Sequence, residues 1–274
     1  MFFKELYQYR YLLREIVQKN IKIQYRHSVL GVLWTLLEPL LTTLVLVFVF
    51  GQIFGGNRIN QDPGIVNFPI YLLCGRLLFD FYSKSTKQAM KSVRSSASVI
   101  KKVKVPKYIY PLANVVSNFV TFMISMIVLV GFIVFFFAVN NPRNPPPVLS
   151  LYLLQAPIPL IILFILCTGV GLIISTMAVF FKDMEYLYSV FCMTLFYVTP
   201  IFWSAQTLNA GAAHEFLLHM NPLYSIIEMF RNSVLRGLPI HLPHLWYSLG
   251  FALLMLVIGI WLFKKKQDKF ILHI

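Results

Sequence analysis

Six long apolar runs, separated by charged or proline-rich segments, divide this sequence. They cover residues 29–54, 68–82, 108–139, 156–181, 186–203 and 245–263. A bilayer core about 30 Å thick is crossed by roughly 20 apolar residues of α-helix, and most of the runs approach or exceed that length. The second run is short, so we expect its helix to continue past Ser83. The pattern predicts an all-α membrane protein with six transmembrane helices.

Composition supports a membrane environment and argues against several other classes of protein. Of the 274 residues, 58% are hydrophobic and only 12% are charged, which is unlike a soluble domain. The net charge of +14 does not indicate nucleic-acid binding, because the Lys and Arg residues flank apolar runs instead of forming a soluble basic face. Cys74, Cys167 and Cys192 lie inside apolar runs without metal-ligand spacing. We expect them to be core residues, with no disulfide framework and no metal site.

Basic residues predict the orientation of the chain. If both termini are cytoplasmic, most of the 24 Lys and Arg residues lie on the cytoplasmic side, as the positive-inside rule requires. An even number of spans with the N- and C-termini inside follows. In this orientation Arg58, Arg143, Arg231 and Arg236 are external, and Arg76 lies within the second run.

The segments outside the runs complete one membrane domain over residues 1–274. Residues 1–27 place apolar and charged side chains on opposite helix faces, which predicts an amphipathic interface helix. It could lie on anionic lipid, dock a cytoplasmic partner, or do both. The six-span core then covers 29–263, and 264–274 form a cytoplasmic tail. Residues 206–243 are only moderately apolar and rich in Gly and Pro, so we expect a re-entrant helical hairpin before the last span.

The sequence contains no G-x-x-x-x-G-K-[ST] phosphate loop, so ATP-driven transport would need a separate ATPase subunit. Residues 92–105 combine a polar, helix-capable stretch with a basic cluster, and we interpret them as a coupling helix that docks such a subunit. The turn 182–185 offers a second contact. The positive-inside rule alone would also explain these lysines. The residues assigned to ATPase coupling are Ser92, Val99, Lys101, Lys102, Lys104, Lys182, Asp183 and Glu185.

Three charged residues, Glu38, Arg76 and Asp80, fall inside apolar runs. An ionisable group at that depth costs at least about 2.5 kcal/mol and usually has a partner. Arg76 and Asp80 are four residues apart, so on a helix they share a face and can pair. Alternatively, the guanidinium of Arg76 could bind a passing phosphate. Glu38 precedes Pro39, where a helix kink is expected.

Four stretches resemble, in order along the chain, the motifs of ABC-2 type polysaccharide and polyol-phosphate exporter permeases. RHSVLGVLWTLLEPL, residues 26–40, is similar to the opening motif of that family. VIKKVKVPKYIYPL, FFKDMEYLYSVFCMTLFYVTPIFWS and NPLYSIIEMFRNSVLRG follow. Together they cover nearly the whole chain, and the resemblance is closest to teichoic acid translocation permeases. Lys182 departs from the pattern, because an Arg is more usual there and Lys cannot pair in a bidentate manner.

The resemblance implies a homodimer around a central path, with two copies of an ABC ATPase subunit that bind ATP and Mg, and no cofactor in this chain. It implies export of lipid-linked wall teichoic acid across the bacterial cytoplasmic membrane. O-antigen or capsular polysaccharide is the alternative cargo. A membrane-embedded lipid-sugar enzyme would need clustered carboxylates or histidines, which the sequence lacks. A passive channel would not explain the docking-like loops.

Within that family, aromatic side chains have a possible role in the path, because their faces can stack on sugar and polyol surfaces. Aromatic belts at the membrane interfaces are the alternative explanation. The residues assigned to the translocation path lie mostly in the outer halves of the first and fifth runs. They are Phe48, Phe54, Arg76, Tyr197, Phe202 and Trp203.

Overall fold

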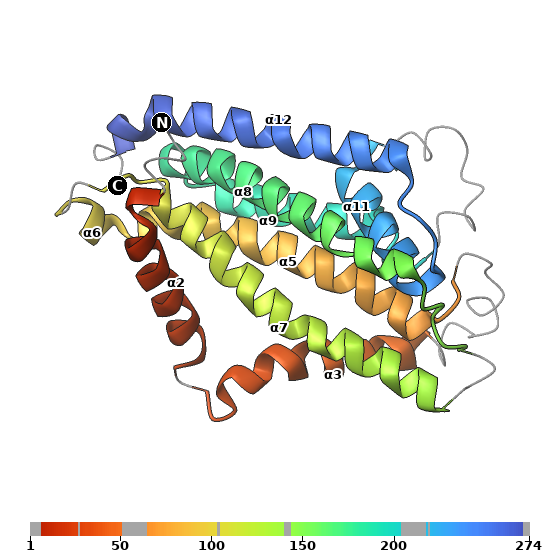
Figure 1. Ribbon diagram of the computed structural model, residues 1–274. Helices are drawn as coiled ribbons and strands as arrows, with labels where there is room; N and C mark the ends of the chain where they lie inside the picture. Colours follow the sequence, from red (N-terminus) through yellow and green to blue (C-terminus); the bar gives the residue numbers. More distant parts are fainter. Residues whose placement is uncertain are drawn as a thin grey trace.

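A computed structural model describes residues 7–26, 28–50, 65–102, 105–139, 144–203, 218 and 220–270. Over these residues the regular elements are all helices, which confirms the all-α prediction. The long helices pack side by side into an elongated bundle (Figure 1). In order they are α2 (Arg10–Tyr25), η1 (Gly31–Leu33), α3 (Trp34–Phe48), α5 (Phe68–Ser95), α6 (Ala97–Ile100), α7 (Ile109–Val139), η3 (Leu151–Gln155), α8 (Pro157–Phe180), α9 (Met184–Val198), α11 (Pro222–Arg231), η4 (Asn232–Arg236), α12 (Leu242–Lys266) and η5 (Gln267–Lys269).

Four helical segments of the described chain are long and apolar enough to cross a membrane. They are Gly31–Phe48, Ile109–Val139, Leu151–Phe180 and Leu242–Lys269. α5 is as long as these segments but carries charged side chains on one face, and α9 has only 15 residues. The sequence predicts six spans, whereas four helical segments of the described residues meet the length and hydropathy expected of a span. The second and fifth predicted spans correspond to α5 and α9.

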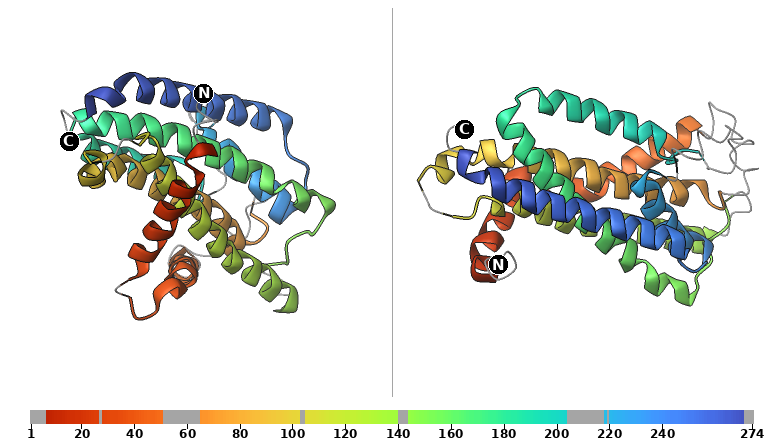
Figure 2. Two further views of the ribbon diagram at one scale, coloured as in Figure 1. Left: turned by 60° about the vertical axis from the view of Figure 1, so that its left-hand side comes forward. Right: turned by 90° about the horizontal axis from the view of Figure 1, so that it is seen from above.

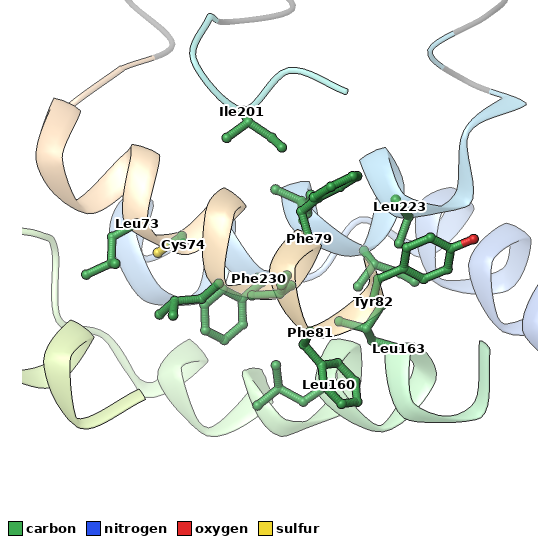
Figure 3. Packing of buried hydrophobic residues seen from close by; sticks show 14 of the residues in the cluster. Leu73, Cys74, Phe79, Phe81, Tyr82, Leu160, Leu163, Ile201, Leu223 and Phe230 are labelled. Carbon is green, nitrogen blue, oxygen red and sulfur yellow. The ribbon is translucent and has the colours of Figure 1, made fainter. Parts of the chain in front are cut away.

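α5 is the central helix of the bundle. Asn67 caps its first turn by accepting a hydrogen bond from the backbone N–H of Ile70 at 3.2 Å. The helix then runs unbroken to Ser95, which confirms that the second run continues past Ser83. It contacts α3, α7, α8, α9 and α11. Figure 3 shows this core, in which Phe79, Phe81 and Tyr82 of α5 lie among residues of α8 and α11.

α8 and α12 make the most extensive helix contact of the described chain, and glycines let their backbones touch. A Cβ atom on Gly169 would lie 2.5 Å from the backbone N of Leu256, and one on Gly259 would lie 2.6 Å from the carbonyl O of Gly169. Small residues at such positions let two membrane helices approach until their backbones touch. The contact between α8 and α12 therefore depends on these two glycines.

α3 and α9 flank α5 and bury little of their own surface. The buried residues of α3 are Thr35, Pro39 and Thr43, and those of α9 are Tyr188 and Cys192. Ser125 Oγ of α7 donates to the Thr35 carbonyl at 2.9 Å and so fixes the start of α3. α9 forms one edge of the bundle (Figure 2). Both helices thus present broad apolar faces outward.

The helix predicted over the fifth run ends earlier than expected. α9 stops at Val198, and Thr199 has an extended backbone, with φ −77° and ψ 130°. Pro200 explains the difference, because proline disfavours helical geometry in the residue before it. The prediction of helix through Trp203 is therefore wrong for the last residues. Phe54, at the end of the first predicted run, lies outside the described residues.

The coupling helix predicted over 92–105 is not a single element. Ser92 belongs to the buried last turns of α5, where its Oγ donates to the Ala89 carbonyl at 2.6 Å. The helix ends at Ser95, Ser96 forms a turn, and α6 follows as a separate four-residue helix. Ser92 is therefore wrongly placed in the predicted docking helix, because the buried face of α5 extends beyond it.

α2 runs at a steep angle to the long helices and lies with α6 and the last turns of α12 at one end of the bundle (Figures 1 and 2). It contacts α7, where Asn20 Nδ2 donates to Asn114 Oδ1 at 3.3 Å. Its apolar residues Leu12, Leu13 and Ile16 pack on a cluster that includes Phe263 and Phe270. α2 and the last turns of α12 therefore contribute to one apolar cluster at this end of the bundle.

Candidate functional site

A single stripe of α5 side chains is not buried, and every residue in it is polar. It runs from the middle of the helix to its end at α6. The residues of this polar stripe are Arg76, Asp80, Ser83, Lys84, Lys87, Gln88, Lys91, Arg94 and Ser95. They recur three or four positions apart and so share one helix face. A charged stripe on the central helix of a membrane bundle requires water or polar partners, because exposure of charges to lipid is costly.

Acidic residues from both flanking helices pair with the polar stripe. Lys84 Nζ lies 2.8 Å from Glu38 Oε1 of α3. Glu185 of α9 lies 3.3 Å from Lys91 Nζ and 3.6 Å from Arg94 Nη1. α3 and α9 are therefore both attached to the basic half of α5 by ion pairs.

The expected Arg76–Asp80 pair is confirmed, with 3.4 Å between Arg76 Nε and Asp80 Oδ2. Both side chains belong to the polar stripe, one helical turn apart. Each remains partly exposed, at 21% for Arg76 and 32% for Asp80. The ion pair is therefore partly exposed on the stripe.

A polar pocket lies beside the Glu38–Lys84 pair, between α2, α3, α5 and α7. Tyr25, Glu38, Asp80, Lys84 and Asn118 contribute to its lining. Burial raises the pKa of the Tyr25 phenol, and the nearby Glu38 carboxylate raises it further, so this hydroxyl stays neutral at physiological pH. The pocket joins the last turn of α2 to the middle of the polar stripe.

At the other end of the stripe, aromatic rings cover α5. Phe50, which follows α3, stacks on Phe202 with ring centroids 5.3 Å apart. Phe202 meets Phe196 of α9 at 5.0 Å, and Phe196 meets Phe79 of α5 at 5.0 Å. Every α5 residue from Phe68 to Gly75 is buried. The polar stripe is thus open toward α6 and ends under an aromatic bridge that joins α3, α5 and α9.

The residues predicted for the path are only partly brought together. Phe202 lies in the aromatic bridge. The Trp203 carbonyl accepts a hydrogen bond from Tyr71 at 2.9 Å. Phe48 and Tyr197, at 64% and 61% exposed, instead project from the outer faces of α3 and α9. Phe54 lies outside the described residues.

The residues predicted for coupling gather at the α6 end of the bundle. Val99 is 43% exposed on α6, while Ile100 beside it is buried. Lys101, Lys102, Lys182 and Asp183 are exposed, and Lys104 lies outside the described residues. Glu185 differs from the others, because it forms ion pairs with Lys91 and Arg94 of the polar stripe.

Arg231 is the residue that sequence reasoning missed. It was expected on the external side, yet its side chain is fully buried at 0% exposure. Its guanidinium donates to the carbonyls of Tyr71, Pro200 and Ile201. The available signal was its place in NPLYSIIEMFRNSVLRG, where the surrounding apolar residues indicate a buried face. Its partners, far away in the sequence, could not be read from that pattern.

Comparison with known proteins gives a consistent result over most of the chain. The model of the family described as "ABC-2 type transporter" matches residues 11–235. The O-antigen export system permease protein RfbA of Klebsiella pneumoniae is 29% identical over 263 residues, which is 94% of this chain and 93% of that protein. The protein of the same name from Myxococcus xanthus is 27% identical, with 83% and 82% covered. Polysialic acid transport protein KpsM of Escherichia coli is 22% identical, with 91% of each chain covered.

Proposed function

Because this chain belongs to the ABC-2 type transporter family, we propose that it is the permease subunit of an exporter that moves a lipid-linked polysaccharide outward, driven by a separate ATPase. It is a multi-pass protein of the cytoplasmic membrane. It is a transport subunit and not itself an enzyme. In the proposal, ATP and Mg bind to two copies of the partner ATPase, and two copies of this permease form the path.

The proposed topology has six spans with both termini in the cytoplasm. α5 and α9 supply the two spans beyond the four long apolar helices. The 28 residues of α5 extend about 42 Å, which exceeds the thickness of the bilayer core. Lys101 follows α6, Lys182 lies just after α8, and Lys264, Lys265 and Lys266 form the last turn of α12. These helix ends lie at the α6 end of the bundle (Figure 1), so this end would be cytoplasmic. The segment with α11 and η4 would be the re-entrant part before α12.

The polar stripe of α5 is the observation that carries the proposal. A hydrophilic polymer needs a wet surface within the membrane, and the stripe supplies one along the half of the central helix that leads toward α6. The apolar faces of α3 and α9 on either side would meet the second copy. Arg76 and Phe202 would contact the cargo, while Phe48 and Tyr197 would line the path only where the second copy covers them.

Co-purification tests this function directly. The tagged chain, extracted from native membranes in mild detergent, is expected to bring down an ATPase with a phosphate loop at equal stoichiometry. A solitary chain, under conditions in which known membrane complexes survive, would contradict the proposal and favour a channel or a membrane-embedded enzyme.

Reversing the charge of Lys101, Lys102 and Lys104 together is expected to weaken docking of the ATPase. Lys101 and Lys102 are exposed beside α6, so their replacement leaves the helix core intact. We expect several-fold less co-purified ATPase and less export, with normal membrane insertion. Reversal of Lys264, Lys265 and Lys266, which lie at the end of α12, is the matched control for loss of cytoplasmic positive charge. Equal ATPase recovery in the two triple variants would contradict a coupling role for the α6 region.

The names of the relatives favour a polysaccharide cargo of the O-antigen or capsular type over wall teichoic acid. The basic character of the polar stripe keeps a polyol-phosphate polymer as a second candidate, because phosphates pair with Lys and Arg. Depletion of the chain in its own bacterium distinguishes the two. Loss of surface polysaccharide supports the first cargo, and loss of wall-linked polyol phosphate with intact polysaccharide supports the second.

A further inference from the structure

Arg231 forms an unusually complete set of contacts for a buried cation. Its Nη1 donates to the Pro200 carbonyl at 2.7 Å, and its Nη2 to the carbonyls of Tyr71 at 3.1 Å and Ile201 at 3.3 Å. Its Nε also faces the Tyr71 carbonyl at 3.3 Å. The guanidinium carbon lies 3.4 Å from the centroid of the Tyr71 ring, which adds a cation–π contact.

Carbonyl groups balance this charge. None of the ion pairs formed by the described residues includes Arg231, whereas Glu228 pairs with Arg236 one turn away. A buried guanidinium without such partners would carry a large desolvation penalty. The hydrogen bonds from Arg231 therefore also fix the positions of the Pro200 and Ile201 carbonyls. Lysine could not substitute, because its single ammonium lacks the planar fork of donors.

Neighbouring contacts show that the surroundings are built around this side chain. A Cβ atom on Gly75 would lie 2.5 Å from Arg231 Nη2. The guanidinium therefore leaves room only for glycine at this position of α5. Asn221 Nδ2 donates to Thr199 Oγ1 at 2.9 Å, which ties the start of α11 to the same turn. The turn after α9 is thus fixed to α11 and α5 together.

We propose that Arg231 is the positioning residue that sets the outer end of the transport path, by holding residues 199–203 so that Phe202 lies in the aromatic bridge above Arg76. The inference rests on the proposed export function. Phe202 has no regular helix to hold it, since α9 ends at Val198. Its place against Phe50 and Phe196 therefore depends on the anchored carbonyls of Pro200 and Ile201 before it, together with the hydrogen bond from Tyr71 to the Trp203 carbonyl after it. Arg231 acts on transport through Phe202 and not by contact with cargo.

A cross-linking assay tests the position of Phe202 without reference to export. With Phe50→Cys and Phe202→Cys in one chain, a short bifunctional thiol reagent is expected to join the two cysteines readily, because the native side chains lie against each other with ring centroids 5.3 Å apart. The native cysteines described are buried and should contribute little background. In the same background Arg231→Lys is expected to slow cross-linking at least tenfold. Arg236→Lys, in the same segment, is the matched control and should leave the rate unchanged.

The second measurement separates positioning from folding. Arg231→Lys is expected to insert, bind its ATPase and hydrolyse ATP at the normal basal rate, while export falls about tenfold. If Arg231→Lys does not accumulate, Gly75→Ala displaces the guanidinium and keeps the arginine. Gly131→Ala, where a Cβ meets nothing within 4 Å, is its control. Unchanged cross-linking and export in the accumulating variant would overturn the inference. Loss of export with unchanged cross-linking would also overturn it, and absence of any ATPase partner in the wild type would instead reject the proposed function.

Discussion

Replacing Gly169 by leucine is expected to separate α8 from α12 and to leave little folded protein. The Cβ atom alone would lie 2.5 Å from the Leu256 backbone N and 2.6 Å from the Met255 carbonyl carbon. Backbone atoms cannot move aside as a flexible side chain would, so the helices must part along their whole contact. Overpacking of a dense core costs typically about 1–3 kcal/mol, and a displaced helix pair adds to that cost.

Fluorescence-detected gel filtration of the detergent-extracted protein after heating measures this effect. Gly169→Ala, the milder change, is expected to lower the midpoint of unfolding by on the order of 5 °C. Gly131→Ala on α7 meets no atom within 4 Å and should be neutral or slightly stabilising, because alanine favours helix over glycine by about 1 kcal/mol. Equal midpoints for the two variants would contradict a backbone contact between α8 and α12 at Gly169.

Reversing the charge of Lys84 is expected to reduce export at least tenfold. Lys84→Glu would bring a third carboxylate to a site that already holds Glu38 and Asp80. Repulsion between like charges near 4 Å amounts to a few kcal/mol at the dielectric constant of a protein surface. The substitution would also place a negative charge in the polar stripe, midway between Arg76 and Arg94. Export by cells that express the variant at wild-type level is the measurement.

A charge swap distinguishes the two effects of Lys84. Glu38→Lys combined with Lys84→Glu restores an ion pair between α3 and α5, so we expect normal abundance. Export should remain low, because the stripe still carries a negative charge at position 84. Lys265→Glu controls for loss of a basic residue, because the native Lys265 Nζ lies over the Trp261 ring and outside the polar stripe. Full export by the swapped variant would mean that Lys84 serves only to hold α3.

Apolar length predicted the helices but not their relative positions. The third and fourth runs match α7 and α8 within one residue at each end, because their hydrophobicity is continuous. The apolar run that predicts α5 ends at Ser83, where the polar stripe interrupts it, and the short run itself indicated that the helix continues; the opposite face of α5 stays buried to Val93. Pro200 was visible in the sequence, and its effect on the end of α9 follows from ordinary proline geometry.

The contacts of the site depend on long-range packing, which local patterns do not encode. Arg76 and Asp80 could be paired from their spacing alone. Arg231 and Tyr71 could not, because 160 residues separate them. The same holds for Glu38 with Lys84, and for Glu185 with Lys91. Each of these pairs joins different helices, so their partners follow only from the arrangement of the bundle.

The one-sided burial of α5 also limits how such a transporter can diversify. Most positions of this helix are fixed by packing against five neighbours, so substitutions there would first be selected for folding. The polar stripe is not buried in that packing, and its interhelix ion pairs involve Lys84, Lys91 and Arg94. Adaptation to a cargo of different charge would therefore accumulate first at Ser83 and Lys87, which lie in the stripe outside these ion pairs, while the scaffold stays unchanged. A directed-evolution library confined to those positions would sample changes in cargo preference with few losses to misfolding.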